Sequence, residues 1–216
     1  DVWGAKRVGL MNYFVKPINP REEIQIVLKR KLERIVLHFY RKDMMKDKGN
    51  INIILVGFMA SGKTTVGSYL AKKISYKFKD TDILIEEEEG MPISQIFEER
   101  GQENFRNLET ELLGKLSSSL NKTVLATGGG MPLRKENQEA LTRLGHVIYL
   151  KASSETILQR VSGDSTRPLL KENPEERVKT LLKERQAIYF KVADKVVETD
   201  KKTIEEICSE ILLSLK

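Results

Sequence analysis

The sequence predicts an α/β protein built on a parallel sheet with helices on both faces. Three observations favour this class. Residues 51–56 form a mostly apolar run that is typical of a buried strand. A glycine-rich segment at residues 57–64 follows directly, and residues 65–73 then place apolar side chains at helical spacing. Strand-like and helix-like segments alternate from there to the end of the chain, as they do in parallel sheets.

The later elements can be placed one by one. A helix at residues 92–100 is closed by Gly101, and a second helix carries Phe105-Arg106. Pro174 opens a further helix, because proline suits the first helical position. We expect the remaining strands at residues 76–79, 124–127, 147–150 and 196–197, and a final helix at residues 203–215.

The segment at residues 57–64 fits the pattern G-x-x-x-x-G-K-[ST] and predicts a phosphate-binding loop. Gly57 and Gly62 allow backbone N–H groups to converge on phosphate oxygens, and the following helix adds the positive end of its dipole. We expect Lys63 to sit on an exposed loop and reach the β- and γ-phosphates, and the Thr64 hydroxyl to ligate Mg²⁺. A strand–helix turn without a ligand is the weaker alternative, because strand, loop and helix are all in place.

A second polar segment, Asp80-Thr81-Asp82, stands at the carboxyl end of the strand at residues 76–79. Open α/β sheets bind ligands at that end of their strands. One carboxylate could face a metal and the other a substrate hydroxyl, although an aspartate cap for the next helix is the alternative. The strand at residues 124–127 lacks the terminal aspartate of GTPases and motor ATPases, which assigns metal support to Asp80.

Three further features belong to the candidate site. Arg106 and Glu109 are spaced i, i+3 and share a helix face, either as site residues or as a surface ion pair. Gly128-Gly129-Gly130 lacks Cβ atoms, so another group could approach its backbone closely. The polar stretch at residues 162–166 precedes Arg167 and suggests a lid that brings positive charge to phosphates, with a plain surface loop as the alternative.

The composition fits a folded chain in a reducing compartment. Hydrophobic residues make up 40% of the chain, and the single cysteine, Cys208, excludes an internal disulfide framework. No apolar run approaches the ~20 residues of a membrane span, and the start lacks a signal-peptide pattern. We therefore expect a cytoplasmic protein with no membrane partner. The chain begins with Asp1 rather than Met, as a fragment or a processed chain would.

The net charge of +6 belongs to the amino-terminal segment. Residues 1–50 carry 12 Lys and Arg against 6 Asp and Glu, whereas the rest of the chain carries 25 of each. No DNA- or RNA-binding motif accompanies this charge, so we expect no nucleic-acid partner.

We expect three parts in the chain: an appendage at residues 1–42, a linker at residues 43–50 and a catalytic domain at residues 51–216. Asn19-Pro20 starts an amphipathic helix in the appendage. The appendage resembles the carboxy-terminal end of haloacid-dehalogenase-like phosphatases, on runs that include Arg7-Val8-Gly9-Leu10 and residues 31–37. The nucleophilic aspartate motif of such a phosphatase is absent, so we assign this part no activity.

In the order in which they occur, the motifs of residues 51–216 resemble the shikimate kinase family. The resemblance rests on the phosphate loop, Asp80-Thr81-Asp82, Phe105-Arg106 with Glu109, Gly128-Gly129-Gly130, Arg167-Pro168-Leu169-Leu170, and Glu184-Arg185 with Tyr189. It implies a P-loop kinase fold of the nucleoside-monophosphate-kinase type, with a five-stranded parallel sheet and a mobile lid. It also implies transfer of the γ-phosphate of ATP, with Mg²⁺, to the 3-hydroxyl of shikimate, a step of chorismate and aromatic amino acid biosynthesis.

The resemblance implies a role for each matching residue. Lys63, Asp82 and Arg167 would be catalytic, with Asp82 accepting the proton of the attacking hydroxyl. Thr64 and Asp80 would hold the metal. The substrate would be bound by Asp82, Arg106, Glu109, Gly128, Gly129, Gly130 and Arg185, the two arginines clamping its carboxylate. The nucleotide would be bound by Gly57, Ala60, Ser61, Gly62, Lys63, Thr64, Thr65, Arg160, Arg167, Thr199 and Lys202, with Arg160 stacked on adenine.

One departure and two alternatives accompany this interpretation. Ala60 stands where family members often have glycine, and its methyl group is expected to tighten the loop. The alternatives are another small-molecule kinase of the same fold, such as a gluconate kinase, and a non-catalytic nucleotide-binding module. We expect a monomer, with the amino-terminal helix available for packing.

Overall fold

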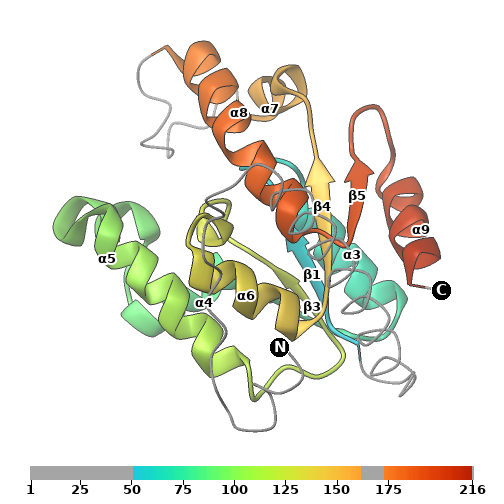
Figure 1. Ribbon diagram of the computed structural model, residues 1–216, viewed down its shortest axis with the longest axis horizontal. Coiled ribbons are helices and arrows are strands. Elements are labelled where there is room, and N and C mark those ends of the chain that lie inside the picture. The colour runs from blue at the N-terminus through green and yellow to red at the C-terminus, as the bar shows by residue number, and fades with distance from the viewer. Residues whose placement is uncertain (1–50, 162–172, 216) are drawn as a thin grey trace, which may run out of the picture. The chain divides into compact units, whose positions relative to one another are not determined.

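The computed structural model describes residues 51–161 and 173–215 (Figure 1). Within these residues five strands form one sheet in the order β2-β3-β1-β4-β5, and all neighbouring strands are parallel. The strands are β1 (Ile53–Val56), β2 (Lys77–Asp80), β3 (Thr123–Ala126), β4 (His146–Lys151) and β5 (Lys195–Glu198). The predicted fold class is confirmed.

Helices cover both faces of the sheet (Figure 1). One face carries α3 (Lys63–Lys73) and α9 (Ile204–Ser214). The opposite face carries the other helical elements: α4 (Thr81–Glu89), α5 (Ile93–Leu116), the 3₁₀ helix η1 (Met131–Leu133), α6 (Lys135–Leu144), α7 (Ser154–Val161) and α8 (Pro174–Val192).

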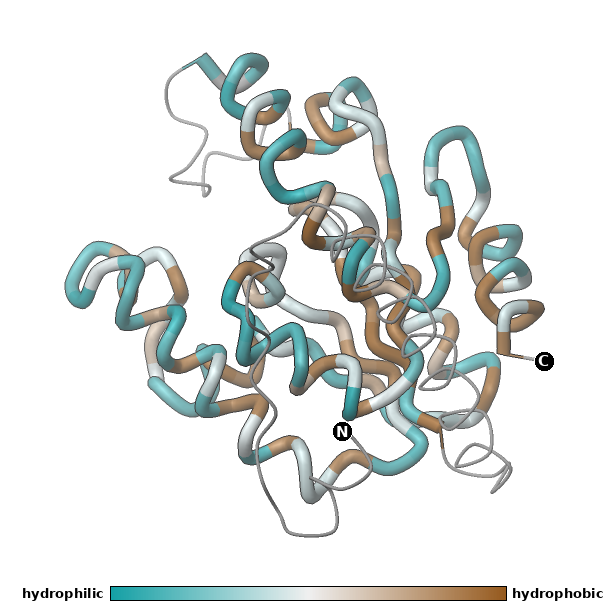
Figure 2. The backbone as a smooth tube through the Cα atoms, in the orientation of Figure 1, coloured by the Kyte–Doolittle hydropathy of each residue, from teal (hydrophilic) through white to brown (hydrophobic). Residues whose placement is uncertain are grey.

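The buried central strand explains the apolar run in the sequence. Ile53 and Leu55 pack in the core cluster beneath α3 and α9, whereas Ile54 and Val56 pack in the cluster on the opposite face. Successive strand residues point to opposite faces, and both faces are covered, so every position must be apolar. The tube in Figure 2 shows the resulting hydrophobic strands between the helical layers.

The strand order places the candidate site. The chain runs from β1 to β2 and β3 on one side and then crosses to β4 and β5 on the other. Ligands of open α/β sheets bind outside the carboxyl ends of the strands at such a reversal. The predicted phosphate loop follows β1, Asp80 is the last residue of β2, and the glycine triplet begins two residues after β3.

The two helices expected on either side of Gly101 form α5, which is interrupted at that residue. Gly101 has φ 78° and ψ 171°, a conformation outside the helix that a residue without Cβ adopts at little cost. Of the described helices, none combines the length and the apolar character needed to cross a membrane. Residues 1–50, with the predicted appendage and linker, and the segment that contains Arg167 lie outside the described residues.

Candidate active site

The phosphate loop has the backbone shape that its sequence predicts. Gly57 has φ 150°, and a Cβ at this position would lie 2.6 Å from the carbonyl oxygen of Leu150, so a side chain there would collide with β4. Gly62 has φ 97° and stands immediately before the first residue of α3. The amino-terminal end of an 11-residue helix therefore points into the loop, where it favours negative charge.

The Lys63 side chain is enclosed, although the sequence predicts that the loop carrying it is exposed. It is buried, and its Nζ donates hydrogen bonds to the carbonyl oxygens of Gly57 (3.0 Å) and Phe58 (2.8 Å). A buried ammonium group requires such partners because its desolvation is costly. The two carbonyls hold the charge inside the curve of the loop, which is where the phosphates of a nucleotide would lie.

Ala60 occupies a strained position in this loop. Its φ of 57° lies in the left-handed region, which costs a residue with a Cβ roughly 1–2 kcal/mol. This explains physically why glycine suits the position. The carbonyl oxygen of Ala60 accepts a hydrogen bond from Arg160 Nη1 at 2.9 Å, which supports the strained residue and draws Arg160 from α7 to the loop.

A pocket of about 440 Å³ opens beside the phosphate loop. Its lining contains nine of the predicted nucleotide-binding residues: Ala60, Ser61, Gly62, Lys63, Thr64, Thr65, Arg160, Thr199 and Lys202. Val66, Ile204 and Ile207 also line it, and the sequence interpretation missed them. Ile204 and Ile207 are spaced i, i+3 at the start of α9, a pattern that predicts core packing as readily as a ligand contact.

Thr64 and Asp80 come together as the metal prediction requires. The Thr64 hydroxyl donates to Asp80 Oδ2 at 2.7 Å, while Asp80 Oδ1 accepts the N–H of Asp82 at 3.0 Å. Asp80 is therefore also the helix cap that was the alternative interpretation, and one side chain does both. No cluster of three or more His, Cys, Asp or Glu side chains able to hold a metal occurs among the described residues. A hydroxyl and a carboxylate nevertheless fit Mg²⁺, which binds through few protein oxygens and keeps water and phosphate ligands.

Two carboxylates, the partly buried Asp82 and the buried Glu109, flank the first glycine of the triplet. A Cβ built at Gly128 would lie 2.5 Å from Asp82 Oδ1 and 2.8 Å from Glu109 Oε1. Neither oxygen has a hydrogen-bond partner among the described residues. Burial, with the nearby charge of Asp80, raises the pKa of Asp82 to about 6. Burial likewise raises the pKa of Glu109 to about 7, against the opposing effect of Arg106. Both groups can therefore accept a proton near neutral pH.

Arg106 and Glu109 form a buried ion pair, so the interpretation as a surface salt bridge is wrong. Arg106 Nη1 contacts Glu109 Oε2, which fixes one edge of the guanidinium group. The guanidinium group lies directly against Gly130, and a Cβ at that position would collide with it. Glycine is therefore required at residue 130 for the arginine to reach this place.

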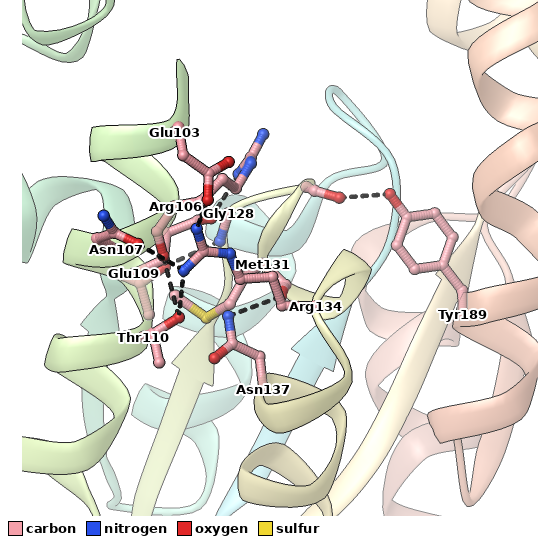
Figure 3. Close-up of polar contacts among 12 residues, drawn as sticks. Glu103, Arg106, Asn107, Glu109, Thr110, Gly128, Met131, Arg134, Asn137 and Tyr189 are labelled. Carbon is pink, nitrogen blue, oxygen red and sulfur yellow. Dashed lines mark hydrogen bonds and ion pairs between the residues drawn. The ribbon is translucent and has the colours of Figure 1, made fainter. Parts of the chain in front are cut away.

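Arg185 and Tyr189 approach the same segment from α8. Tyr189 is fully buried, and its hydroxyl donates to the carbonyl oxygen of Gly129 at 2.6 Å (Figure 3). Burial raises the pKa of Tyr189, and the charges of Arg185 and Arg106 oppose that rise. The Arg185 guanidinium group also lies 5.6 Å from the centroid of the Phe58 ring in the phosphate loop.

The structure thus gathers nearly all predicted site residues at one edge of the sheet. The phosphate loop and its pocket lie at the end of β1, and the carboxylates and arginines surround the glycine triplet after β3. Thr199 is buried, and its hydroxyl donates to the carbonyl oxygen of Lys151 at 3.2 Å, so it also joins β5 to β4. Arg167 lies outside the described residues, and its role stays a prediction.

The fold and this loop define a P-loop kinase. The family model described as shikimate kinase matches residues 59–216. Shikimate kinases from Thermodesulfovibrio yellowstonii and Nitrosococcus oceani are 44% and 45% identical to this chain, over 74% and 77% of it and over 92% and 88% of their own lengths. A solved structure of shikimate kinase from Acinetobacter baumannii in complex with shikimate has a TM-score of 0.72 and 43% identity, covering 75% of this chain and 90% of that one. This chain belongs to the shikimate kinase family.

Proposed function

We propose that this kinase transfers the γ-phosphate of ATP to the 3-hydroxyl of shikimate and requires Mg²⁺. The observation that carries the proposal is a pair of buried arginines on elements that contact the glycine triplet. The Arg106 guanidinium group lies against Gly130, and Arg185 belongs to α8, whose Tyr189 hydroxyl donates to the carbonyl oxygen of Gly129. Two buried guanidinium groups on the helices that contact this segment suit a small carboxylic acid, and the guanidinium fork matches a carboxylate in two hydrogen bonds. Asp82 lies at the same triplet, where a substrate hydroxyl would meet it.

The reaction follows from this arrangement. The substrate hydroxyl oxygen forms a bond to the γ-phosphorus as the bond between that phosphorus and the β–γ bridging oxygen breaks, and ADP leaves. Asp82 accepts the proton of the hydroxyl, because its raised pKa of about 6 suits a base near neutral pH. Lys63 stabilises the charge on the transferring group. Thr64 and Asp80 would hold Mg²⁺, which supplies charge neutralisation at the phosphates when bound. We propose that Arg167 adds further positive charge there.

The test is an ADP-release assay with shikimate and gluconate side by side. We expect ADP release and a phosphorylated product with shikimate, and a far lower rate with gluconate. Equal or faster turnover of gluconate would favour the other small-molecule kinase. Binding of ATP without turnover of either acid would favour the non-catalytic module.

The two arginines give a prediction that separates acid binding from nucleotide binding. Arg106→Lys and Arg185→Lys should each raise KM for shikimate roughly 10- to 100-fold, because lysine keeps the charge but loses the fork, at a cost of about 1.5–3 kcal/mol. KM for ATP should change by less than about twofold. Arg143→Lys, an exposed arginine of α6, is the matched control. Equal effects on both substrates would place the arginines outside the acid site.

We also propose that residues 51–216 act as the catalytic domain without residues 1–50. All described site residues lie at or beyond Gly57. A chain beginning at Lys48 should therefore keep kcat and both KM values within a factor of about two, or ~0.4 kcal/mol. Steady-state kinetics and the melting temperature of both chains measure this. A folded truncated chain that cannot phosphorylate shikimate would show that the division at residue 50 is wrong. A lower melting temperature with intact kinetics would instead indicate that the predicted amphipathic helix of the appendage packs on the domain.

A further inference from the structure

Arg134 joins the segment after the glycine triplet to α5. It follows η1 and immediately precedes α6, four residues beyond Gly130. Its guanidinium group extends across to α5, where three side chains converge on it (Figure 3). These are Glu103, Asn107 and Thr110, which are spaced i, i+4 and i+7 and so lie on one face of the helix.

The contacts hold the turn of α5 that carries Arg106. Arg134 Nη1 donates to Asn107 Oδ1 at 2.8 Å and to Thr110 Oγ1 at 3.3 Å, and Nη2 pairs with the Glu103 carboxylate. The Thr110 hydroxyl in turn donates to the main-chain oxygen of Arg106 at 3.0 Å. The Arg134 side chain is only 19% exposed, and its contact with Thr110 is partly shielded from water, whereas the contact with Asn107 is exposed. Glu103 is 84% exposed, and its ion pair is the weakest part of the set.

The segment that carries Arg134 is itself held in place by hydrogen bonds. Asn137 Nδ2 donates to the carbonyl oxygen of Met131, and Gln138 Nε2 donates to that of Pro132, both at 3.0 Å. The N–H of Leu133 donates to the carbonyl oxygen of Gly130, also at 3.0 Å. The segment that carries Arg134 is thus held by α6 and by its own backbone, and it can serve as a fixed reference for α5.

We propose that Arg134 is a positioning residue for the acid-binding side of the site. It sets the distance between α5 and the glycine triplet. At this distance the Arg106 guanidinium group lies against Gly130, and Glu109 faces Gly128. Bidentate binding of a carboxylate tolerates displacements of only about 0.5 Å, so a small shift of α5 weakens it. Arg134 itself acts through Arg106. The inference rests on the proposed function, because it takes shikimate as the acid bound there.

The experiment compares Arg134→Ala and Arg134→Lys in the full chain with Arg143→Ala as the matched control. Arg143 is an exposed arginine of α6 whose Nε donates to the Glu139 carbonyl oxygen of its own helix. We expect Arg134→Ala to raise KM for shikimate about tenfold, with KM for ATP within about twofold of the original. Arg134→Lys should recover part of the loss, because lysine restores the charge but not the fork. The control should leave all constants unchanged.

A second measurement tests whether Arg134 acts through Arg106. If it does, the double variant Arg134→Ala, Arg106→Lys should have a KM for shikimate close to that of Arg106→Lys alone, and not the product of the two effects. Multiplied effects, equal changes in both KM values, or a lower melting temperature with unchanged constants would each overturn the inference. If the unsubstituted protein does not phosphorylate shikimate, the proposed function itself is wrong. If the unsubstituted protein phosphorylates shikimate and Arg134→Ala leaves KM for shikimate unchanged, only the inference about Arg134 is wrong.

Discussion

Lys63→Ala is expected to lower kcat by two to three orders of magnitude while the chain stays folded. Lys63 is held inside the phosphate loop by the carbonyl oxygens of Gly57 and Phe58, so its charge is already placed where negative charge develops in the reaction. Removing one such preorganised donor costs about 3–4 kcal/mol of transition-state stabilisation. No movement of the fold is needed to explain a loss of this size.

The burial of Lys63 also predicts a measurable effect on stability. The alanine variant removes the Lys63 donor from the carbonyl oxygens of Gly57 and Phe58, and the Phe58 oxygen keeps the N–H of Ser61 at 3.2 Å, so the melting temperature should fall only modestly. Single-turnover kinetics and thermal unfolding are therefore measured together, with Lys72→Ala as control, an exposed lysine at the end of the same helix. A near-normal kcat in Lys63→Ala would contradict the assignment of residues 57–64 as a phosphate-binding loop, regardless of any change in melting temperature.

The sheet and the phosphate loop were predictable because their signals are local. A strand buried on both faces needs apolar residues at every position, and β1 has them from Ile53 to Val56. The loop needs glycine at Gly57 and Gly62 because both have positive φ. Asp80 could be placed because it ends a strand and begins a helix. In each case the physical requirement falls on residues that are neighbours in the sequence.

The remaining parts of the site depend on contacts between distant segments. Tyr189 meets Gly129 across 60 residues, and Arg134 meets Glu103 across 31, and neither pair has a local signal. The burial of Lys63 was missed for a different reason: its partners are close in the sequence but are carbonyl oxygens, which every residue has. The family resemblance placed Arg106 and Glu109 in the site, but only the structure shows that Gly130 must lack a side chain for Arg106 to reach it.

Asp82→Asn is the second change with a large expected effect, and Asp80→Asn is its comparison. If Asp82 takes the proton of the substrate hydroxyl, its amide variant should lower kcat by roughly 10²- to 10⁴-fold, because asparagine keeps the shape but cannot accept the proton. Binding of Mg²⁺ and ATP should stay nearly intact, since the Thr64–Asp80 contact does not involve the Asp82 carboxylate. Asp80→Asn should instead alter the dependence of the rate on Mg²⁺ concentration.

Titration of Mg²⁺ against both variants distinguishes the two carboxylates, which are only two residues apart. Asp80 accepts hydrogen bonds through both of its oxygens, from the Thr64 hydroxyl and from the Asp82 N–H, so it is tied to the phosphate loop. Asp82 Oδ1 faces Gly128 and has no partner among the described residues, so it is placed for a substrate rather than for the loop. The two variants must therefore differ in their metal response. An identical Mg²⁺ dependence in both variants would mean that the separate roles, metal support for Asp80 and proton acceptance for Asp82, are wrong, even if each variant lost its activity.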